Sequence, residues 1–481
     1  MPYYDYVIVG AGPVGLTLAW CLSQYGQKCL LLDREASLGG MHRVRRVKGG
    51  LFSEHGPRMY FNHYFALQHV LREMNSDFYD LFVPYDFGIT ELGGRTLKSL
   101  AFYEFFQLSL QYLGMLFDQG AYSKKITVAD FMQQKKFSRT SMEYFDGLCR
   151  LTDGAAADRY TLFELLQMFN QHFFYQPYQP KLANDQGLFK IWENALKSTG
   201  LVEIQLNMEL VKLVDAKTIV LRSTLTKESK KLKFDETSRL ILAIAPQTLQ
   251  GLLVGSLVGS FNKNIFGPIE EFSIWAHQSR YLEYISICYY FDPIKIKLPR
   301  VWGFPNSPWG VVFAPLSNYM DFGNEVVIST CITKLDHISP VSGKTANQSD
   351  RKELVSECFR QLLGAYPNLP NPKHSIVSPG IIRQGDKWID IDQGFVRTVD
   401  GFWSHRQAID KNYQNWYWCG TFNGNSPYHF TSMESAMTNA FSLVHELIPE
   451  STKRYPIHTP FTFGQFLILC IMVMLLLKIR G

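Results

Sequence analysis

A glycine cluster near the start of the chain constrains its fold more than any other feature. The run Gly10-Ala11-Gly12-Pro13-Val14-Gly15 follows an apolar stretch at 6–9 and precedes a helical pattern at 16–25. In a strand–turn–helix of this kind, the first glycine permits the tight turn and the second lets the backbone approach a pyrophosphate. The third lets the helix pack on the strand, and the helix N-terminus faces the phosphate charge. The sequence therefore predicts a Rossmann-type domain that binds a dinucleotide.

The second predicted strand ends in an acid. The run Lys28-Cys29-Leu30-Leu31-Leu32 leads directly to Asp33. In dinucleotide-binding domains, an acid about 20 residues beyond the glycines accepts hydrogen bonds from the ribose hydroxyls. Asp33 taken alone could equally cap a helix or close a turn, but together with the glycines it indicates ribose binding. At this point NAD, NADP and FAD all fit the pattern.

Bulk properties exclude several other classes of protein. A chain of 481 residues is longer than one ordinary domain, so we expect two interleaved lobes. The formal net charge of +5 comes with no dense stripe of Lys and Arg, which argues against nucleic-acid binding. The eight cysteines show no CxxC and no Cys/His metal spacing, so we expect buried free thiols in a reducing compartment and no metal site.

The C-terminal end is strongly apolar. Residues 461–477 form a run of 17 residues without a charge, which is the lower limit for a membrane-spanning helix. We interpret this run as a transmembrane anchor, joined to the folded part by a linker at 449–460. The first five residues have neither a basic nor an apolar segment of the kind found in signal peptides. The expectation is a tail-anchored, single-pass membrane protein whose folded part faces the cytosol.

The pattern of strands and helices predicts an α/β fold in which a nucleotide-binding domain is interleaved with an α+β substrate domain. Aromatic-rich helical patterns occupy 103–117 and 162–174, whereas strand patterns return at 202–221 and 239–244 and again at 285–333. We therefore assign 1–75, 182–265 and 376–448 to the nucleotide-binding domain. Residues 76–181 form the predicted helical cap of the substrate domain, and 266–375 form its sheet.

Four separated motifs narrow the nucleotide to one kind. They are the glycine cluster with Asp33 and Gly39-Gly40, the run Glu54-His55-Gly56-Pro57-Arg58, the strand Ser238 to Gln247, and Tyr417 to Gly420 followed by Thr431 to Ala436. In order and spacing they resemble the flavin-dependent amine oxidase superfamily, which includes protoporphyrinogen oxidase and carotenoid desaturase relatives and has UDP-galactopyranose mutase as a cousin. The resemblance implies FAD, held noncovalently because Cys419 stands at the wrong place for a covalent bond.

The resemblance also implies a role for individual residues. Those facing the pyrophosphate and ribose would be Gly10, Gly12, Gly15, Asp33, Gly39 and Gly40. Arg43 would neutralise phosphate charge, since Met41 stands where the family has an arginine, and Leu210 would lend its backbone to the adenine. Gly56 and Pro57 would pass close to the flavin ring, and Gly420 would approach the phosphate or ribityl chain. Ser432, Met433 and Glu434 would present N–H groups to the ring's pyrimidine carbonyl.

The implied activity is hydride transfer from an amine or an apolar small molecule to the flavin. The candidate catalytic residues are His55, Arg58, Tyr428 and His429, although Arg58 could be a structural ion-pair partner and His429 a core residue. Ser432 replaces a tyrosine of the family's aromatic cage, and the strand at 282–291 lacks the lysine that many oxidases keep near the ring. Two alternatives therefore stay open: a redox-neutral enzyme resembling UDP-galactopyranose mutase, and a catalytically inactive FAD-binding membrane protein.

Overall fold

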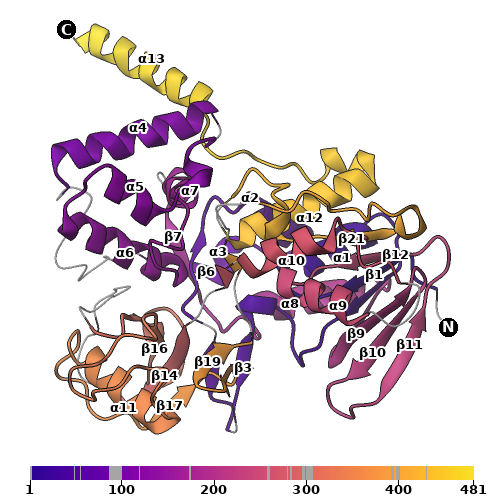
Figure 1. Ribbon diagram of the computed structural model, residues 1–481, viewed down its shortest axis with the longest axis horizontal. Helices are drawn as coiled ribbons and strands as arrows, with labels where there is room; N and C mark the ends of the chain where they lie inside the picture. Colours follow the sequence, from indigo (N-terminus) through magenta and orange to yellow (C-terminus); the bar gives the residue numbers. More distant parts are fainter. Residues whose placement is uncertain are drawn as a thin grey trace.

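The protein is described here by a computed structural model (Figure 1). The described residues are 3–47, 49–54, 56–85, 100–118, 120–172, 175–256, 261–278, 280–281, 284–294, 298, 307–391, 395–396, 401–429 and 431–480. They form two regions. One is built on a parallel sheet, and the other combines an antiparallel sheet with a group of helices.

The parallel sheet has five strands in the order β21-β12-β1-β2-β8. Their bounds are β1 Tyr6–Val9, β2 Cys29–Leu32, β8 Val202–Gln205, β12 Arg239–Leu242 and β21 Trp416–Trp418. Neighbouring strands run parallel throughout. Because side chains alternate along a strand, Tyr6 and Ile8 enter the core on one face, and Val7 and Val9 enter the core on the other. Both faces are buried, as the apolar run at 6–9 requires.

Each face of the parallel sheet is covered by its own layer. One core contains residues of α1 Pro13–Ser23, α8 Leu188–Ser198 and α12 Met433–Leu447. The opposite core contains residues of β9 Met208–Asp215, β10 Thr218–Ser223, α9 Pro246–Gly255 and α10 Ile269–Gln278. An exposed strand, β11 Ser229–Lys233, completes the small antiparallel sheet β11-β10-β9. The β1–α1–β2 unit and its flanking layers establish the expected Rossmann-type α/β fold.

The second region contains an antiparallel sheet in the order β15-β16-β14-β17. Its strands are β14 Ile285–Phe291, β15 Val311–Pro315, β16 Val326–Ile332 and β17 His374–Val377. On β14, Cys288 and Tyr290 join a core with the helices α4 Phe102–Asp118, α5 Val128–Gln134, α6 Arg139–Asp153 and α7 Leu162–His172. Ile287 and Tyr289 point the other way and pack with α11 Arg351–Leu362. The alternation along β14 therefore joins the helices and α11 through one sheet.

Short elements connect the two regions. They are β3 Val44–Arg46, β4 Phe52–Glu54, β5 Tyr60–Phe61, α2 Phe65–Glu73, α3 Phe78–Leu81, β6 Phe82–Pro84, β7 Pro177–Pro180, β13 Arg280–Tyr281, β18 Ile381–Gln384, β19 Lys387–Asp390 and β20 Phe395–Val396. The N-terminus of α2 is fixed to α12, because the buried Glu434 carboxylate accepts hydrogen bonds from the N–H groups of Ala66 at 2.8 Å and Leu67 at 3.3 Å.

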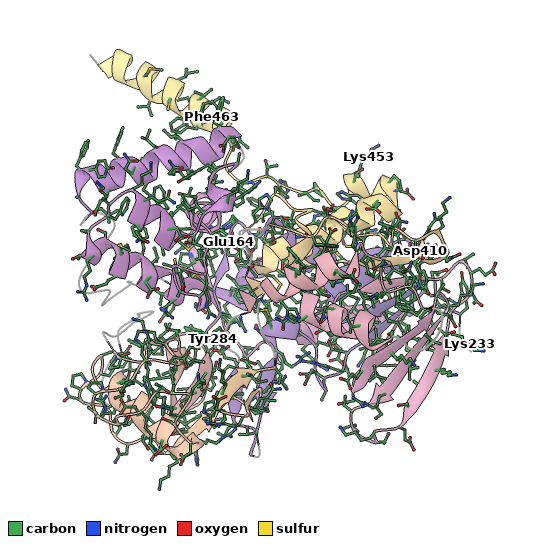
Figure 2. The ribbon with its side chains drawn as sticks, viewed as in Figure 1. Glu164, Lys233, Tyr284, Asp410, Lys453 and Phe463 are labelled. Atoms are coloured by element: carbon green, nitrogen blue, oxygen red, sulfur yellow. The ribbon has the colours of Figure 1, made fainter. Side chains whose placement is uncertain are left out.

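The last helix, α13 Phe463–Arg480, extends away from the body of the protein beside α4 (Figure 1). The Phe463 ring meets the Phe117 ring of α4 edge-on at 5.6 Å, and Asn170 Nδ2 donates to the Phe461 carbonyl at 3.1 Å (Figure 2). Within the described part of the chain, no helix has both the length and the apolar character needed to cross a membrane. The predicted transmembrane anchor at 461–477 is therefore not supported.

All eight cysteines are free thiols. Seven of them are buried, and Cys470 on α13 is partly exposed. Burial raises the pKa of several of them, as at Cys331, where it reaches about 12. A thiol with so high a pKa is a poor nucleophile, so the expected buried free thiols are confirmed and act as core residues.

Candidate functional site

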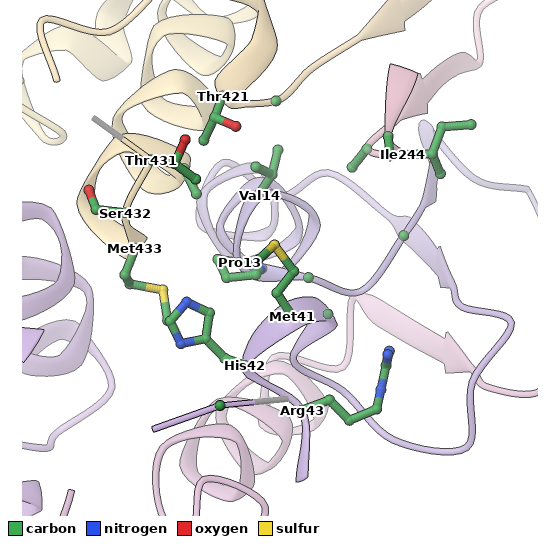
Figure 3. Close-up of a pocket in the computed structure, with 18 of the residues that line it drawn as sticks. Pro13, Val14, Met41, His42, Arg43, Ile244, Thr421, Thr431, Ser432 and Met433 are labelled. Atoms are coloured by element: carbon green, nitrogen blue, oxygen red, sulfur yellow. The ribbon is translucent and has the colours of Figure 1, made fainter. Parts of the chain in front are cut away.

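A cavity of about 500 Å³ runs from the parallel-sheet domain into the second region. At one end it is lined by Asp33, Met208 and Leu210, and at the other by Tyr284, Val312 and Thr333. The turn after β1, the start of α12 and the end of α6 all contribute to its wall. Ligand sites of open α/β sheets lie outside the carboxyl ends of the strands, and the cavity begins at that edge (Figure 3).

The glycine turn after β1 has the close contacts that the motif predicts. Gly10 has a φ of +109°, and a Cβ there would lie 2.3 Å from the Ala243 carbonyl oxygen. A Cβ on Gly40 would lie 2.9 Å from the Gly12 Cα, so these two glycines bring a second segment against the turn. A Cβ on Gly15 would lie 1.8 Å from the Gly10 carbonyl oxygen. Gly10, Gly15 and Gly40 therefore cannot carry a side chain without a shift of the neighbouring backbone.

Asp33 lies at the end of β2 and organises this end of the cavity. Its Oδ2 accepts a hydrogen bond from the Ala11 N–H at 2.7 Å, and its Oδ1 accepts one from the Glu35 N–H at 2.9 Å. Arg43 Nη2 contacts the same Oδ1 at 3.2 Å, and both side chains are buried. The guanidinium that was expected at the cofactor phosphate is thus held by Asp33 and by the Ser37 carbonyl.

The middle of the cavity is formed by the start of α12. Ser432 is the N-cap residue, and its hydroxyl accepts a hydrogen bond from the Ser435 N–H at 3.1 Å. Figure 3 shows Thr431, Ser432 and Met433 on this turn, and Met433 and His42 line the same cavity. His42 Nδ1 shares a hydrogen bond with the Tyr60 hydroxyl at 3.2 Å. A helix N-terminus therefore faces the cavity at the place where the sequence motif put one.

The far end of the cavity joins segments that are distant in the sequence. A Cβ on Gly56 would lie 3.1 Å from Cys331 Sγ and 3.6 Å from the Tyr284 ring. On the opposite side of that ring, a Cβ on Gly154 would lie 2.7 Å away. Figure 2 labels Tyr284 between the antiparallel sheet and the helices above it. Tyr284 thus connects the segment after β4 with the C-terminal end of α6.

Two arginines line this far end. Arg58 Nη2 donates a hydrogen bond to the Met41 carbonyl, and Arg58 Nε has no partner among the described residues. On α6, Arg150 Nε contacts Asp146 Oδ2 at 2.8 Å, and Arg150 Nη1 donates to the Thr333 carbonyl at 2.7 Å. Arg150, Gly154 and Thr333 also line a second cavity of about 620 Å³, so the two cavities adjoin at this arginine.

Two carboxyl groups are buried next to the cavity. Burial raises the pKa of Glu54, the last residue of β4, to about 8. Burial also raises the pKa of Glu434 to about 8, against the effect of the backbone N–H groups at the start of α2. Both groups are therefore largely protonated near pH 7 and add little negative charge to the site.

The structure brings most of the predicted cofactor residues to one cavity. Its wall includes Gly10, Gly12, Asp33, Gly40, Arg43, Gly56, Pro57, Leu210, Gly420, Ser432 and Met433. Three others lie behind it: Gly15 packs on Gly10, Gly39 packs on the Phe189 ring, and Glu434 caps α2. These three support the cavity wall without forming part of it.

The four predicted catalytic residues have different positions. Arg58 lines the far end of the cavity, whereas His55 lies outside the described residues. Tyr428 is buried, and its backbone carbonyl accepts a hydrogen bond from Ser435 Oγ. The His429 ring lies against the rings of Phe402 and Phe163. Neither Tyr428 nor His429 lines the cavity, because the turn before α12 directs them into the surrounding core.

Four other residues line the far end, and none of them belongs to a recognisable sequence motif. Arg150 belongs to an amphipathic helical pattern, which predicts that a charged side chain is solvent-exposed. The patterns around Tyr284, Cys331 and Thr333 predict ordinary strand residues. Arg150 reaches the cavity where α6 meets the end of β16, at the Thr333 carbonyl. Only a motif that recorded this long-range contact could have identified them.

The comparisons with known proteins agree with this geometry. Residues 8–74 match the family model of the NAD(P)-binding Rossmann-like domain. The structure resembles putrescine oxidase bound to putrescine, with a TM-score of 0.62 and 13% identity over 93% of this chain and 99% of that one. At this identity the likeness shows a shared fold. Reduced UDP-galactopyranose mutase also aligns, with a TM-score of 0.55 and 16% identity over 95% of this chain and all of that one.

A relative at the sequence level is UDP-galactopyranose mutase of Mycoplasma pneumoniae, which is 34% identical over 59 residues. This match covers 12% of the chain and 15% of the relative's own length. It is thus confined to a small part of both proteins.

Proposed function

We propose that the protein is an oxidoreductase that binds FAD noncovalently and oxidises a small-molecule substrate. The observation that carries this proposal is the continuity of the cavity. It starts at a glycine turn suited to a pyrophosphate and ends between α6 and the antiparallel sheet of the second region. A dinucleotide laid along it from the ribose end would reach the start of α12, with space for a substrate beyond.

The residues present fit this cofactor. Gly10, Gly12 and Gly40 offer bare backbone to the pyrophosphate, because a Cβ at Gly10 or Gly40 would collide with neighbouring backbone. Asp33 and the backbone of Leu210 would hold the adenosine end, and the first N–H groups of α12 would hold the ring end. FAD, when bound, supplies a ring that accepts a hydride from the substrate. The protein's part is to orient the two and to exclude water.

The test of this proposal is optical. Purified protein should be yellow, and acid precipitation should release all of the flavin into the supernatant. Anaerobic mixing with a panel of amines, porphyrinogens and UDP-sugars should then bleach the flavin with at least one compound and without added reductant. Colourless protein that takes up no FAD would refute the proposal.

A second candidate is a redox-neutral reaction of the mutase kind. The sequence match to UDP-galactopyranose mutase and the two arginines at the far end of the cavity favour it. In that case the panel should leave the oxidised flavin unchanged, and turnover of a UDP-sugar should begin only after reduction with dithionite. Bleaching by an unreduced substrate would decide for the oxidoreductase.

We further propose that the protein associates with a lipid membrane through α13 and α4. Exposed apolar side chains on these neighbouring helices support this proposal, among them Phe102 at 85%, Phe117 at 75% and Ile468 at 59% exposure. The described side chains of α13 beyond Gln465 are apolar, as is typical of a helix whose neighbour is lipid or protein interior. Such a surface is costly to leave in water.

Flotation with phosphatidylcholine vesicles tests the membrane proposal. Full-length protein should rise with the vesicles, and the double variant Phe102→Ser/Phe117→Ser should bind several-fold less. The matched control is Ile338→Ser, which removes a side chain of 65% exposure from a different part of the protein. Equal flotation of both variants would refute a role for α4.

A further inference from the structure

The two ends of the cavity differ in charge. At the adenosine end, the carboxylates of Asp33, Glu35 and Glu209 line the wall together with Arg34 and Arg43. At the far end, the charged residues that line the wall within the described part of the chain are Arg58 and Arg150, and none is a carboxylate. The site that receives the substrate is therefore positively charged, whereas the opposite end is mixed.

The contacts around Tyr284 place the two arginines in one neighbourhood. Arg58 follows Gly56, which lies close to Tyr284 and to Cys331 Sγ. Arg150 precedes Gly154, which lies against the same ring, and it donates to the carbonyl of Thr333, two residues after Cys331. The Arg58 guanidinium itself reaches back to the Met41 carbonyl, next to the glycine turn, so Arg58 lines the cavity between that turn and the end that Tyr284 closes.

Both arginines keep donors for a ligand. Arg58 has one hydrogen bond, to Met41, and Arg150 has two contacts, to Asp146 and Thr333. Since a guanidinium carries five N–H donors, each has several without a partner among the described residues. Asp146 Oδ2 pairs with Arg150 Nε and balances part of its charge, whereas the remaining Arg150 N–H groups face other directions than this bond. The buried Glu54 beside Arg58 does not compensate either, because it is largely protonated near pH 7.

The rest of the far wall is apolar or neutral and includes Leu151, Met168, Val312, Cys331, Tyr284 and Thr152. A protonated amine placed here would meet two guanidinium groups and no carboxylate on the described wall, so its ammonium would lose hydration without gaining a partner. A carboxylate or a phosphate would gain charge-assisted hydrogen bonds from a planar donor group.

We infer that the substrate of this site carries an anionic group, a carboxylate or a phosphate ester, bound by Arg58 and Arg150 beside an apolar body. The inference rests on the proposed function, since it takes the far end of the cavity as the substrate site. It sets this chain apart from the putrescine oxidase that it resembles in fold, whose structure holds a diamine.

Isothermal titration of FAD-loaded protein with benzoate, phenyl phosphate and benzylamine tests the inference, because these probes share a ring and differ in charge. We expect both anions, or one of them, to bind at least about tenfold more tightly than benzylamine. A preference for benzoate would indicate a carboxylate substrate, and a preference for phenyl phosphate a phosphate ester. Benzylamine binding that equals or exceeds that of both anions would overturn the inference.

Arg150→Gln should weaken binding of the preferred anion about tenfold, and Arg150→Lys should weaken it less, since lysine keeps the charge but loses the fork. The control is Arg351→Gln at the start of α11, an exposed arginine that lines neither of the two cavities. Unchanged anion binding in Arg150→Gln and in Arg58→Gln would overturn the inference. FAD uptake measured on the same samples separates this result from a failure of the proposed function, which would leave the wild type colourless.

Discussion

The adenosine end of the cavity and its far end are built by different means. The adenosine end is formed by backbone, with Gly10 against the Ala243 carbonyl, Gly12 against Gly40, and Asp33 fixed by the Ala11 N–H. The far end is formed by side chains from α6, from the segment after β4 and from the antiparallel sheet. A pyrophosphate needs N–H groups in one fixed arrangement, whereas a substrate site needs particular side chains that different folds can supply from different places.

Because of this difference, the two ends should tolerate substitutions differently. At the backbone-built end, an added methyl group meets main-chain atoms that cannot move aside. At the far end, an added or altered group meets side chains such as Tyr284 and Cys331, which have some freedom to adjust. Substitutions should therefore cost most at the adenosine end and should change ligand preference at the far end.

Gly10→Ala should have the largest effect. The new Cβ would lie 2.3 Å from the Ala243 carbonyl oxygen, and the φ of +109° is one that alanine rarely adopts. We expect FAD binding to be lost and the free energy of unfolding to fall by more than about 4 kcal/mol, measured by flavin absorbance and urea denaturation. Gly26→Ala is the control, because its φ is +76° but nothing lies within 4 Å of the new Cβ. That control should lose only about 1 kcal/mol and keep its flavin.

Asp33→Asn should have the next largest effect. It leaves Arg43 buried without its carboxylate and weakens the hold on the Ala11 N–H, so we expect a loss of about 3 kcal/mol and a fall in FAD affinity. Asp185→Asn is the matched control, since the Asp185–Arg46 pair is partly exposed and should contribute less than about 1 kcal/mol. If Asp33→Asn and Asp185→Asn lowered the free energy of unfolding equally, burial would not make the Asp33–Arg43 pair contribute more to stability than the Asp185–Arg46 pair.

The same difference explains what the sequence could predict. The glycine turn, Asp33 and the start of α12 are local signals, because each combines residues that are close in the chain and that set backbone geometry. They predicted the Rossmann-type domain, and they predicted that Ser432 and Met433 would line the same cavity as Gly10. Gly15, Gly39 and Glu434 carry the motif as well, but they pack behind the wall.

The far end could not be predicted in this way. Arg150 reaches the cavity only through the packing of α6 against the end of β16, which brings its Nη1 to the Thr333 carbonyl. Tyr428 and His429 were expected near the flavin ring because they precede α12 in the sequence. The turn instead places His429 against Phe402 and Phe163. Proximity along the chain does not fix the direction of a side chain in a loop.

The buried carboxyl at the far end predicts a pH dependence of stability. Folding raises the pKa of Glu54 from 4.5 to about 8, so the folded chain keeps a proton that the unfolded chain releases between these values. Stability from this group is full below about pH 4.5 and is lost as the pH rises toward 8, by up to about 1.4 kcal/mol per pH unit.

Glu54→Gln should make the stability less dependent on pH over this interval, as measured by urea denaturation at several pH values. Glu434 has a pKa raised to about 8 as well, so part of the dependence should persist in the variant. The stability of a variant at an exposed carboxyl, Glu143→Gln, should follow that of the wild type at every pH. If Glu54→Gln also followed the wild type, Glu54 would have to be ionised in the folded protein, and it would compensate part of the positive charge at the far end.

The smallest expected effects come from one added methyl group at each end. In Gly56→Ala the new Cβ lies 3.1 Å from Cys331 Sγ and 3.6 Å from Tyr284, so a side chain must shift by a few tenths of an ångström. We expect unchanged FAD affinity and about threefold weaker binding of the preferred anionic probe, or about 0.6 kcal/mol.

In Gly12→Ala the new Cβ is 3.6 Å from the Gly40 Cα, without a clash, but it narrows the approach to the turn. In Gly12→Ala, FAD affinity should fall while anion binding by the FAD-saturated protein persists. If FAD affinity and anion affinity changed equally in either variant, the two ends of the cavity would not be independent.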